Sequence, residues 1–366
     1  MRLLVTGGGT GGHIYPALAV ADELLKQGGE VLYVGTARGL ESDIVPREGI
    51  PFKTIPVRGL LNKSPLQAGV GVFVAALGVL EAARIIRRFR PEVVLGTGGY
   101  VSGPVVLAAR LLSVPYFLQE QNVLPGATNR LMSRWARGVF VPYAECARYF
   151  PRRARLYVTG NPIRTGILGV KRDDASRALG LSPHMKTVLV LGGSRGAKTI
   201  VDASTDIARE LLKRSDAQMI LVTGSRYYDR AVEDFAKEGL SGERLRVFAY
   251  LYDMGKALAA SDLVVCRAGA MTIAEVTSAG LPAVLIPSPN VAGNHQEYNA
   301  RLLVSEGAAV MIADREAEGW RVAGNVLQIL FDEERLSAMR SAARALGRPY
   351  AAKRIVEVMT KAAHSI

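Results

Sequence analysis

The chain has 366 residues, a formal net charge of +13 and an apolar content of 49%, with 38 glycines and 17 prolines. A chain of this length is too long for one ordinary hydrophobic core and suits two domains of roughly 150 to 200 residues each. The composition is that of a globular α/β protein. Only two cysteines occur, Cys146 and Cys266, and no signal peptide precedes the first predicted strand. The sequence therefore predicts a protein of the reducing cytoplasm and argues against a disulfide-stabilised secreted one.

Strand and helix patterns alternate through both halves of the chain. In the first half, apolar runs predict strands at 3–6, 30–35, 92–98 and 114–120, with helices near 16–27, 70–88 and 103–112. In the second half, they predict strands at 187–192, 218–224, 246–251, 262–267 and 282–287, with helices near 197–214, 228–238, 253–260, 271–279 and 295–305, and two closing helices at 332–346 and 349–363. Such alternation predicts right-handed crossovers and two Rossmann-like, doubly wound parallel-sheet domains.

The boundary between the two domains is expected near VTGNPIR at 158–164, where Gly160 and Pro162 interrupt the pattern. This gives a first domain at 1–159 and a second at 160–345. Residues 346–366 contain the closing helix, and the sequence leaves open whether it packs against the first domain.

Two of the strands end in a glycine-rich turn that leads into a helix: LLVTGGGTGGH at 3–13 and VLVLGGSRGA at 188–197. Each turn places backbone N–H groups at a helix N-terminus, where the helix dipole favours a phosphate or a sugar diphosphate. The first turn also matches the G-x-G-x-x-G pattern of dinucleotide sites. However, the next strand ends Tyr33-Val34-Gly35-Thr36, without the carboxylate that would hold a ribose, which argues against a nicotinamide-dependent dehydrogenase.

The positive charge is concentrated in the first half. Residues 1–159 hold 19 Lys and Arg against 10 Asp and Glu, a net charge of +9, and the remainder has a net charge of +4. A basic surface suits nucleic acid, anionic lipid or a polyanionic substrate. Because neither zinc-finger spacing nor an aromatic and basic base-stacking pattern occurs, nucleic acid is not a predicted partner.

Twelve successive apolar residues, Gly69 to Leu80, lie between two basic segments. A run of this length is too short to cross a bilayer, which needs about 20 residues. One interpretation is a crossover helix buried on the sheet. The other is an apolar patch ringed by cations that holds the protein on an anionic membrane surface, formed by Leu60, Leu61 and Leu66 with Arg58, Lys63 and Arg84 to Arg88. Both can hold, because loop and helix face different ways.

Several polar residues follow predicted strands and are candidates for chemistry. His13 directly follows the first glycine turn, where an imidazole could act as a general base or donate a hydrogen bond, or could only satisfy the helix end. Glu120 and Asn122 lie in QEQNVLPG, where Asn122 could hydrogen-bond a sugar and Glu120 could take up a proton or orient a neighbour. Tyr100 lies in GGYVSGP, and either loop could instead serve only as a turn.

In CRAGAMTIAE, at 266–275, Thr272 and Glu275 have the spacing of a capping box. The alternative is that Gly269 lets a ligand approach the backbone while Glu275 accepts hydrogen bonds from the two hydroxyls of a ribose. A carboxylate suits a neutral diol and repels a phosphate.

Seven ordered motifs resemble the MurG family of bacterial transferases, which add N-acetylglucosamine to undecaprenyl-pyrophosphoryl-N-acetylmuramyl pentapeptide. The motifs are GGGTGGHIYPALAVA at 7–21, GGYVSGP at 98–104, EQN at 120–122, GNPIR at 160–164, GGSRGA at 192–197, CRAGAMTIAE at 266–275 and NHQEYNA at 294–300. The resemblance implies a GT-B fold whose two domains face a cleft, the first taking the lipid-linked acceptor and the second UDP-N-acetylglucosamine. It also implies a peripheral location on the cytoplasmic face of the cell membrane. The alternative is a GT-B transferase that acts on another lipid or a small molecule.

The resemblance also implies roles for individual residues. Donor contacts would come from Thr10, Gly11, Gly12, Asn122, Arg164, Ser194, Leu251, Ala270, Met271, Thr272, Ile273, Ala274, Glu275 and Gln296, with Glu275 on the ribose and Gln296 on the transferred sugar. His13, Tyr100 and Glu120 would lie on the acceptor side, with His13 and Glu120 as the catalytic candidates.

One position departs from the family, because Gln119 stands where a histidine is common. Glutamine cannot take up a proton at neutral pH, so His13 becomes the stronger candidate for the base. The implied reaction is a single inverting displacement. No Asp-x-Asp metal clamp occurs at a strand end, so no cofactor is expected to be required, although the diphosphate leaves room for Mg²⁺.

Overall fold

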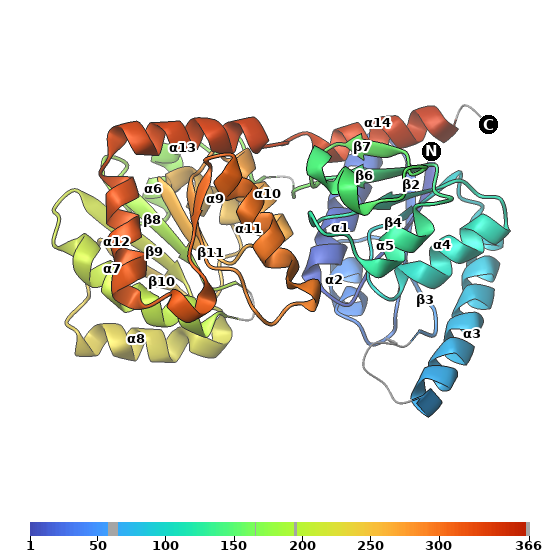
Figure 1. The fold of residues 1–366 in the computed structure, drawn as a ribbon, viewed down its shortest axis with the longest axis horizontal. Helices are drawn as coiled ribbons and strands as arrows, with labels where there is room; N and C mark the ends of the chain where they lie inside the picture. The colour runs from blue at the N-terminus through green and yellow to red at the C-terminus, as the bar shows by residue number, and fades with distance from the viewer. Residues whose placement is uncertain (58–64, 165, 194–195, 364–366) are drawn as a thin grey trace. The chain divides into compact units, whose positions relative to one another are not determined.

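The computed structural model describes residues 1–57, 65–164, 166–193 and 196–363, with residues 65–72 and 292 described by their backbone alone, and the chain divides into two compact units (Figure 1). Unit 1 is Met1–Arg164 together with Tyr350–Ile366, and unit 2 is Thr165–Pro349. The division thus falls after Arg164, a few residues beyond the expected boundary. The last helix of the chain belongs to unit 1.

Unit 1 is built on a seven-stranded parallel sheet with the order β3-β2-β1-β4-β5-β6-β7. Its strands are β1 (Arg2–Thr6), β2 (Glu30–Gly35), β3 (Phe52–Thr54), β4 (Val93–Gly96), β5 (Tyr116–Gln119), β6 (Gly138–Val141) and β7 (Leu156–Val158). In register, Leu3 of β1 lies opposite Val31 of β2 and Val93 of β4. Because all neighbours are parallel, the loops that follow β1, β4 and β5 meet at one edge of the sheet.

Helices cover both faces of this sheet, as the alternation along each strand requires. Leu3 and Val5 face α1 (Gly11–Lys26) and α14 (Ala351–Ala363), whereas Leu4 faces α3 (Pro65–Phe89) and α4 (Ser102–Leu111). The remaining helices of the unit are α2 (Glu41–Arg47), α5 (Ala127–Met132) and the 3-10 helix η1 (Ala144–Tyr149). In consequence α14 and α3 lie on opposite faces of the sheet.

Unit 2 is built on a six-stranded parallel sheet with the order β10-β9-β8-β11-β12-β13. Its strands are β8 (Lys186–Leu191), β9 (Ala217–Val222), β10 (Leu245–Phe248), β11 (Leu263–Cys266), β12 (Ala283–Leu285) and β13 (Ala309–Met311). Its helices are α6 (Arg172–Ala178), α7 (Lys198–Leu212), α8 (Tyr228–Lys237), α9 (Met254–Ala260), α10 (Ala270–Ser278), α11 (His295–Ser305), α12 (Gly319–Leu330) and α13 (Glu333–Leu346), with 3-10 helices η2 (Ser225–Tyr227), η3 (Ala292–Asn294) and η4 (Asp314–Glu316). One face of the sheet packs against α7 and α12.

The predicted strands all occur, but four further strands were not expected: β3, β6, β7 and β13, each of three or four residues. Segments this short show no alternation that distinguishes a strand from a loop. The first helix also begins at Gly11 rather than near Pro16, which lies inside it. Proline donates no hydrogen bond and its ring crowds the carbonyl of residue i−4, here Gly12, but the helix continues through it.

The interpretation of the apolar segment as a buried crossover helix is only half right. In α3, Ala82 and Ile86 are buried, but Phe73, Leu77 and Leu80 have 66%, 41% and 59% of their surface exposed. The physical reason is length: 25 helical residues extend roughly 37 Å, whereas the four residues of β4 extend only about 13 Å. As Figure 1 shows, the N-terminal part of α3 runs past the sheet. The residues Arg58, Leu60, Leu61 and Lys63 lie outside the described part of the chain, and of Leu66 only the backbone is described.

Both cysteines are free and buried, Cys146 in unit 1 and Cys266 at the end of β11. Burial raises the pKa of each thiol to about 12. Each thiol is therefore protonated at neutral pH and contributes to packing rather than to nucleophilic chemistry. Among the described residues, no helix combines the length and the apolar character that crossing a bilayer requires.

Candidate active site

The first glycine turn is held open by its own backbone and by a neighbouring turn. Gly9 has a positive φ of 84°, and a Cβ on Gly99, in the loop after β4, would lie 2.2 Å from the Gly8 carbonyl oxygen. The two turns therefore pack together only because residues 9 and 99 are both glycines. Thr10 is the N-cap of α1 in an extended conformation with no side-chain cap bond, so the amides of the first helical turn, at Gly11 and Gly12, face an anion-binding position.

A buried carboxylate fixes this turn by a hydrogen bond. Glu41, at the start of α2, is fully buried, and it accepts hydrogen bonds from Gly9 N at 3.1 Å and from Thr36 N and Oγ1 at 3.1 and 2.7 Å. Beside it, the Tyr33 hydroxyl donates to Gly7 O at 2.8 Å; burial and the Glu41 charge raise the pKa of that hydroxyl, so it remains a donor. Glu41 was not predicted. It lies five residues beyond Thr36, the end of the predicted strand at which a dinucleotide site would place its carboxylate.

His13 lies in the first turn of α1 with its ring against the neighbouring loop. Its Nδ1 is 3.1 Å from Gly8 O and 3.1 Å from Thr10 Oγ1, and a Cβ on Gly98 would lie 2.9 Å from the imidazole Cδ2. A carbonyl oxygen can only accept, so the bond to Gly8 assigns the hydrogen of the neutral ring to Nδ1. The lone pair able to take up a proton is then on Nε2.

Tyr100 borders the same turn. A Cβ on Gly9 would lie 2.9 Å from Cε1 of the Tyr100 ring, so the ring lies against the turn. Of the Tyr100 surface, 39% is exposed. The structure thus brings together the predicted residues Thr10, His13 and Tyr100 at the carboxyl edge of the unit 1 sheet.

Glu120, the other catalytic candidate, is buried under the loop that it begins. Its carboxylate accepts hydrogen bonds at 2.9 to 3.3 Å from the backbone N–H groups of Gln121, Asn122 and Gly126 and from the side-chain amides of Asn122 and Asn129. Both oxygens are used by loop donors. This geometry fits the second of its two expected uses, orienting a neighbour, and the neighbour that it orients is Asn122.

Gln119 belongs to a buried amide network. It donates from Nε2 to Asn161 Oδ1 at 2.9 Å and accepts from Gln121 Nε2, while Asn161 Nδ2 donates to Gln121 O at 2.9 Å. Sequence reasoning missed Asn161, although it stands inside the quoted motif GNPIR. The network joins the end of β5 to the segment after β7.

Arg164, the last residue of the first segment of unit 1, stacks on Tyr15 of α1. Its guanidinium carbon lies 5.1 Å from the centroid of the Tyr15 ring, and the same ring is 3.1 Å from the position of a Cβ on Gly11. Arg164 therefore lies near the N-terminus of α1, where a diphosphate could use its charge.

The second glycine turn, in unit 2, precedes α7. Gly193 and Gly196 have positive φ values of 79° and 75°, and a Cβ on Gly196 would approach Tyr227 Cδ2 to 2.3 Å. The predicted donor contact Ser194 lies outside the described residues.

The capping-box interpretation of CRAGAMTIAE is wrong. Helix α10 begins at Ala270, its N-cap is Gly269, and Gly269 makes no side-chain cap bond; Thr272 is the third residue of the helix. Thr272 therefore cannot be the capping residue. The amides of the first turn, at Ala270, Met271 and Thr272, have no intrahelical acceptor. Ile273 and Ala274 are buried, and Glu275 is half-buried one turn along.

The other predicted residues of unit 2, Leu251 and Gln296, follow β10 and β12 in the chain. Leu251 lies after β10, between Tyr250 and Tyr252 in the sequence, and the rings of these two tyrosines meet edge to face with centroids 4.8 Å apart. Gln296, in α11, accepts a hydrogen bond from Ser288 N at 2.8 Å, which orients its amide. Arg267 is tied to Asp314 and to the carbonyl oxygens after β12, a structural contact. In the described ranges, no cluster of three or more His, Cys, Asp or Glu side chains could hold a metal ion.

Two parallel-sheet units, each with a glycine turn opening a helix, define the class of a GT-B glycosyltransferase. The profile of the glycosyltransferase family 28 N-terminal domain matches residues 3–141, and that of the family 28 C-terminal domain matches residues 187–355. The chain belongs to glycosyltransferase family 28 and, within it, to the MurG family.

Relatives along the full chain support this membership. The UDP-N-acetylglucosamine--N-acetylmuramyl-(pentapeptide) pyrophosphoryl-undecaprenol N-acetylglucosamine transferase of Moorella thermoacetica is 46% identical with 100% of both chains covered, and that of Desulforudis audaxviator is 44% identical with 99% of both covered. The crystal structure of Acinetobacter baumannii MurG aligns with a TM-score of 0.79 at 29% identity, covering 98% of this chain and 99% of that one. A UDP-GlcNAc 2-epimerase from Neisseria meningitidis, at 16% identity and a TM-score of 0.69, shares the fold.

Proposed function

We propose that this chain transfers N-acetylglucosamine from UDP-N-acetylglucosamine to the muramyl sugar of undecaprenyl-pyrophosphoryl-N-acetylmuramyl pentapeptide in peptidoglycan synthesis. The single observation that carries this proposal is 46% identity over the whole chain to a transferase that bears this activity in its name. The order of the site residues along both sheets agrees with it.

The reaction is one inverting displacement. The 4-hydroxyl oxygen of the muramyl sugar forms a bond to the anomeric carbon, the bond from that carbon to the β-phosphate oxygen breaks, and UDP leaves with the electron pair. The hydroxyl proton passes to His13 Nε2, since Nδ1 is used by the Gly8 carbonyl. His13 is thus the proposed base, Glu120 positions Asn122, and Tyr100 borders the acceptor.

The leaving diphosphate gains negative charge in the transition state. The amides of Gly11 and Gly12 and the guanidinium of Arg164 would stabilise this charge more than that of the ground state. Thr10 and Asn122 would complete the donor contacts of unit 1. No metal ion is needed in this account.

The proposed nucleotide site lies in unit 2. The amides of Ala270 to Thr272 would meet phosphate, Glu275 would accept from the ribose hydroxyls, and Leu251 would offer its backbone to uracil. Ser194 and Gln296 would complete the set, with Gln296 on the transferred sugar.

Release of UDP that depends on the acceptor tests the proposal. The full chain is incubated with UDP-N-acetylglucosamine and a polyprenyl-pyrophosphoryl-muramyl acceptor, and UDP is measured. We expect release only when both substrates are present. Equal release with a glycerolipid or flavonoid acceptor would assign the chain to another acceptor class, and donor binding without turnover would indicate a nucleotide-sugar binding protein.

Replacing Glu275 with glutamine is expected to weaken UDP binding by about 10- to 100-fold, because a hydrogen bond to a charged group contributes about 1.5–3 kcal/mol. Calorimetric titration with UDP measures this. The matched control is Glu306→Gln, an exposed carboxylate of the same unit, which should bind as the unaltered chain does. Loss of helix content with unchanged affinity would contradict the binding role.

We further propose that α3 attaches the protein to the cytoplasmic face of the cell membrane as a peripheral protein. The exposed side chains Phe73, Leu77 and Leu80 recur at helical spacing on one face, and the exposed cations Arg84, Arg87 and Arg88 follow them. An apolar stripe beside cations suits an anionic lipid surface.

Exchanging Leu77 and Leu80 for serine together is expected to reduce sedimentation with phosphatidylglycerol vesicles by about tenfold or more, since each buried leucine contributes about 1.5–3 kcal/mol. Turnover of a water-soluble acceptor analogue should not change. The control Leu25→Ser/Val232→Ser removes two similarly exposed apolar side chains elsewhere. Equal loss in both double variants would remove α3 as the attachment site.

A further inference from the structure

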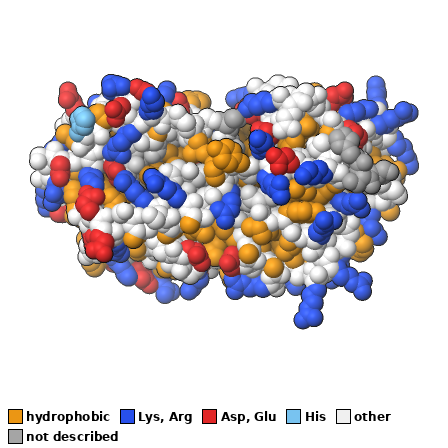
Figure 2. Space-filling model, turned by 90° about the horizontal axis from the view of Figure 1, so that it is seen from above, with side chains coloured by type: hydrophobic (Ala, Val, Ile, Leu, Met, Phe, Trp, Pro, Cys, Tyr) orange, Lys and Arg blue, Asp and Glu red, His pale blue; other side chains and the backbone are white. Residues whose placement is uncertain are grey.

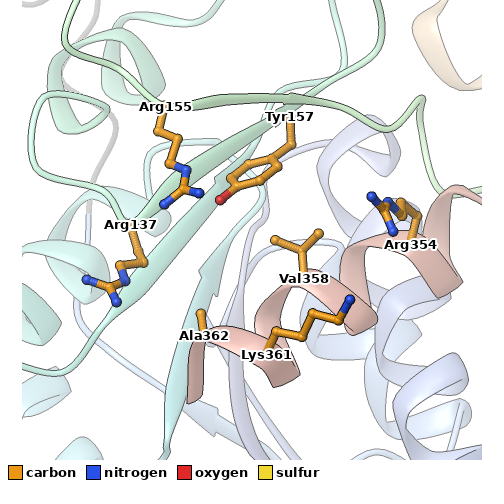
Figure 3. Close-up of a pocket in the computed structure, with 7 residues that line it drawn as sticks. All are labelled: Arg137, Arg155, Tyr157, Arg354, Val358, Lys361 and Ala362. Atoms are coloured by element: carbon orange, nitrogen blue, oxygen red, sulfur yellow. The ribbon is translucent and has the colours of Figure 1, made fainter. Parts of the chain in front are cut away.

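Unit 1 contains a basic pocket on the opposite side of its sheet from α3. The pocket has a volume of about 300 Å³ and is lined by four cations, one tyrosine and two apolar side chains: Arg137, Arg155, Tyr157, Arg354, Val358, Lys361 and Ala362. As Figure 3 shows, these residues come from the strand segments on one side and from α14 on the other. Its volume lies at the lower end of the range for small-molecule sites.

The pocket is distinct from the candidate active site. Arg137 directly precedes β6 and Arg155 directly precedes β7, so both mark the amino ends of their strands. The glycine turns, His13 and Glu120 follow the carboxyl ends of β1, β4 and β5 in the same parallel sheet. Amino and carboxyl ends of parallel strands lie at opposite edges, so a ligand here could not touch the reacting groups.

The chain builds this pocket with defined packing. A Cβ on Gly138 would lie 2.4 Å from Tyr157 Cε2, so the glycine makes room for the tyrosine ring across β6. The ring is fixed further by Phe140, at a centroid distance of 5.8 Å, and by the Arg155 guanidinium, at 5.3 Å. Helix α14 buries Ile355, Val356 and Met359 in the core of unit 1 and so presents Arg354, Val358, Lys361 and Ala362 along another face.

Positive charge in the pocket is only partly compensated. Arg354 forms an ion pair with Glu357 at 3.2 Å, but the Arg137 and Arg155 guanidinium groups have no carboxylate partner among the described residues. Asp and Glu are absent from its lining. Figure 2 shows that Lys and Arg side chains also predominate over Asp and Glu on the surface of unit 1 around α14.

We propose that this pocket binds a phosphorylated small anion. Arginine forks match phosphate oxygens bidentately, and several cations around one concave site favour a ligand of more than one negative charge. The Tyr157 hydroxyl can donate an additional hydrogen bond, and Val358 and Ala362 give the pocket an apolar wall. Because α14 supplies half of the lining, the bound anion joins the end of the chain to β6 and β7. The phosphate is that of a soluble molecule, since this face lies opposite α3.

The test is a calorimetric titration of the full chain with inorganic pyrophosphate, with UDP held at saturation to occupy the nucleotide site. We expect saturable binding that Arg137→Gln/Arg155→Gln weakens by at least about tenfold. The matched control is Arg152→Gln/Arg153→Gln, which removes two exposed arginines of the preceding turn and should change the affinity by less than about twofold. A second pair, Arg354→Gln/Lys361→Gln, should weaken binding to a similar extent from the α14 side.

Other outcomes overturn the proposal. Equal affinity of the unaltered chain and Arg137→Gln/Arg155→Gln would show that pyrophosphate binds elsewhere. If the control pair weakened pyrophosphate binding equally, the effect would come from general surface charge and not from the pocket. In a separate arm, phosphatidylglycerol vesicles replace pyrophosphate; binding to vesicles alone, lost in Arg137→Gln/Arg155→Gln, would identify the phosphate as a lipid headgroup and exclude the soluble ligand. Urea unfolding followed by Trp135, in unit 1, in a Trp320→Phe background shows for every variant that the fold of unit 1 is intact.

Discussion

Replacing His13 with alanine is expected to lower turnover by about 10²- to 10⁴-fold, the usual contribution of a general base. The donor affinity should fall far less, because His13 holds its turn through one bond to Gly8 O and one to Thr10 Oγ1. Steady-state kinetics for turnover and calorimetry with UDP measure the two effects separately. His13→Gln should be as inactive as the alanine variant, since an amide can replace the hydrogen bond but cannot take up a proton.

The control for His13 is His184→Ala, which removes an exposed imidazole in unit 2 and should leave both quantities unchanged. If His13→Ala lowered turnover and donor affinity equally, His13 would shape the glycine turn rather than act as the base. Substantial activity in His13→Gln would argue against proton transfer.

Replacing Glu41 with alanine is expected to destabilise unit 1 by about 3 kcal/mol and to lower turnover at least tenfold. The buried carboxylate accepts from Gly9 N and from both donors of Thr36, and each buried donor left without a partner costs about 1–3 kcal/mol. The glycine turn would then lose the bond that fixes Gly9. Glu41 touches no proposed substrate position, so it is a positioning residue.

Urea unfolding can follow unit 1 alone. The chain has two tryptophans, and in a Trp320→Phe background only Trp135, in unit 1, reports. Glu48→Ala, an exposed carboxylate that follows α2, is the control and should change neither stability nor turnover. Glu41→Gln should recover part of the stability because it retains one acceptor. An unchanged unfolding curve for Glu41→Ala would contradict the supporting role.

Long-range packing decided what the sequence could not show about the site. No carboxylate stands at the end of the second predicted strand, at Thr36, and this absence argued correctly against a dehydrogenase. The carboxylate that matters, Glu41, points inward to protein amides, and only the fold shows this. Likewise, EQN identified Glu120, but whether its oxygens face a substrate or a loop depends on the path of residues 121–129.

Helices α10 and α3 show the same limit of local sequence patterns. Thr272 and Glu275 have capping-box spacing, yet the N-cap of α10 is Gly269, so the spacing gave the wrong capping residue although the helix was predicted within one residue of its observed start. The apolar composition of α3 predicted burial, yet its length carries Phe73 and Leu77 beyond the sheet. Local sequence determines that a segment is helical; what covers each face depends on distant strands.

The sequence alone determined the fold class, the family and the position of both glycine turns, because alternating strands and helices and ordered glycine motifs are local patterns. The confirmed parallel-sheet fold and family membership rest on these patterns. Only the tertiary structure assigned the hydrogen of the neutral His13 ring to Nδ1, placed Glu41 against the glycine turn and joined α14 to β6 and β7 around a basic pocket. These features unite residues up to about 220 positions apart, and a chain reveals such neighbours only when it folds.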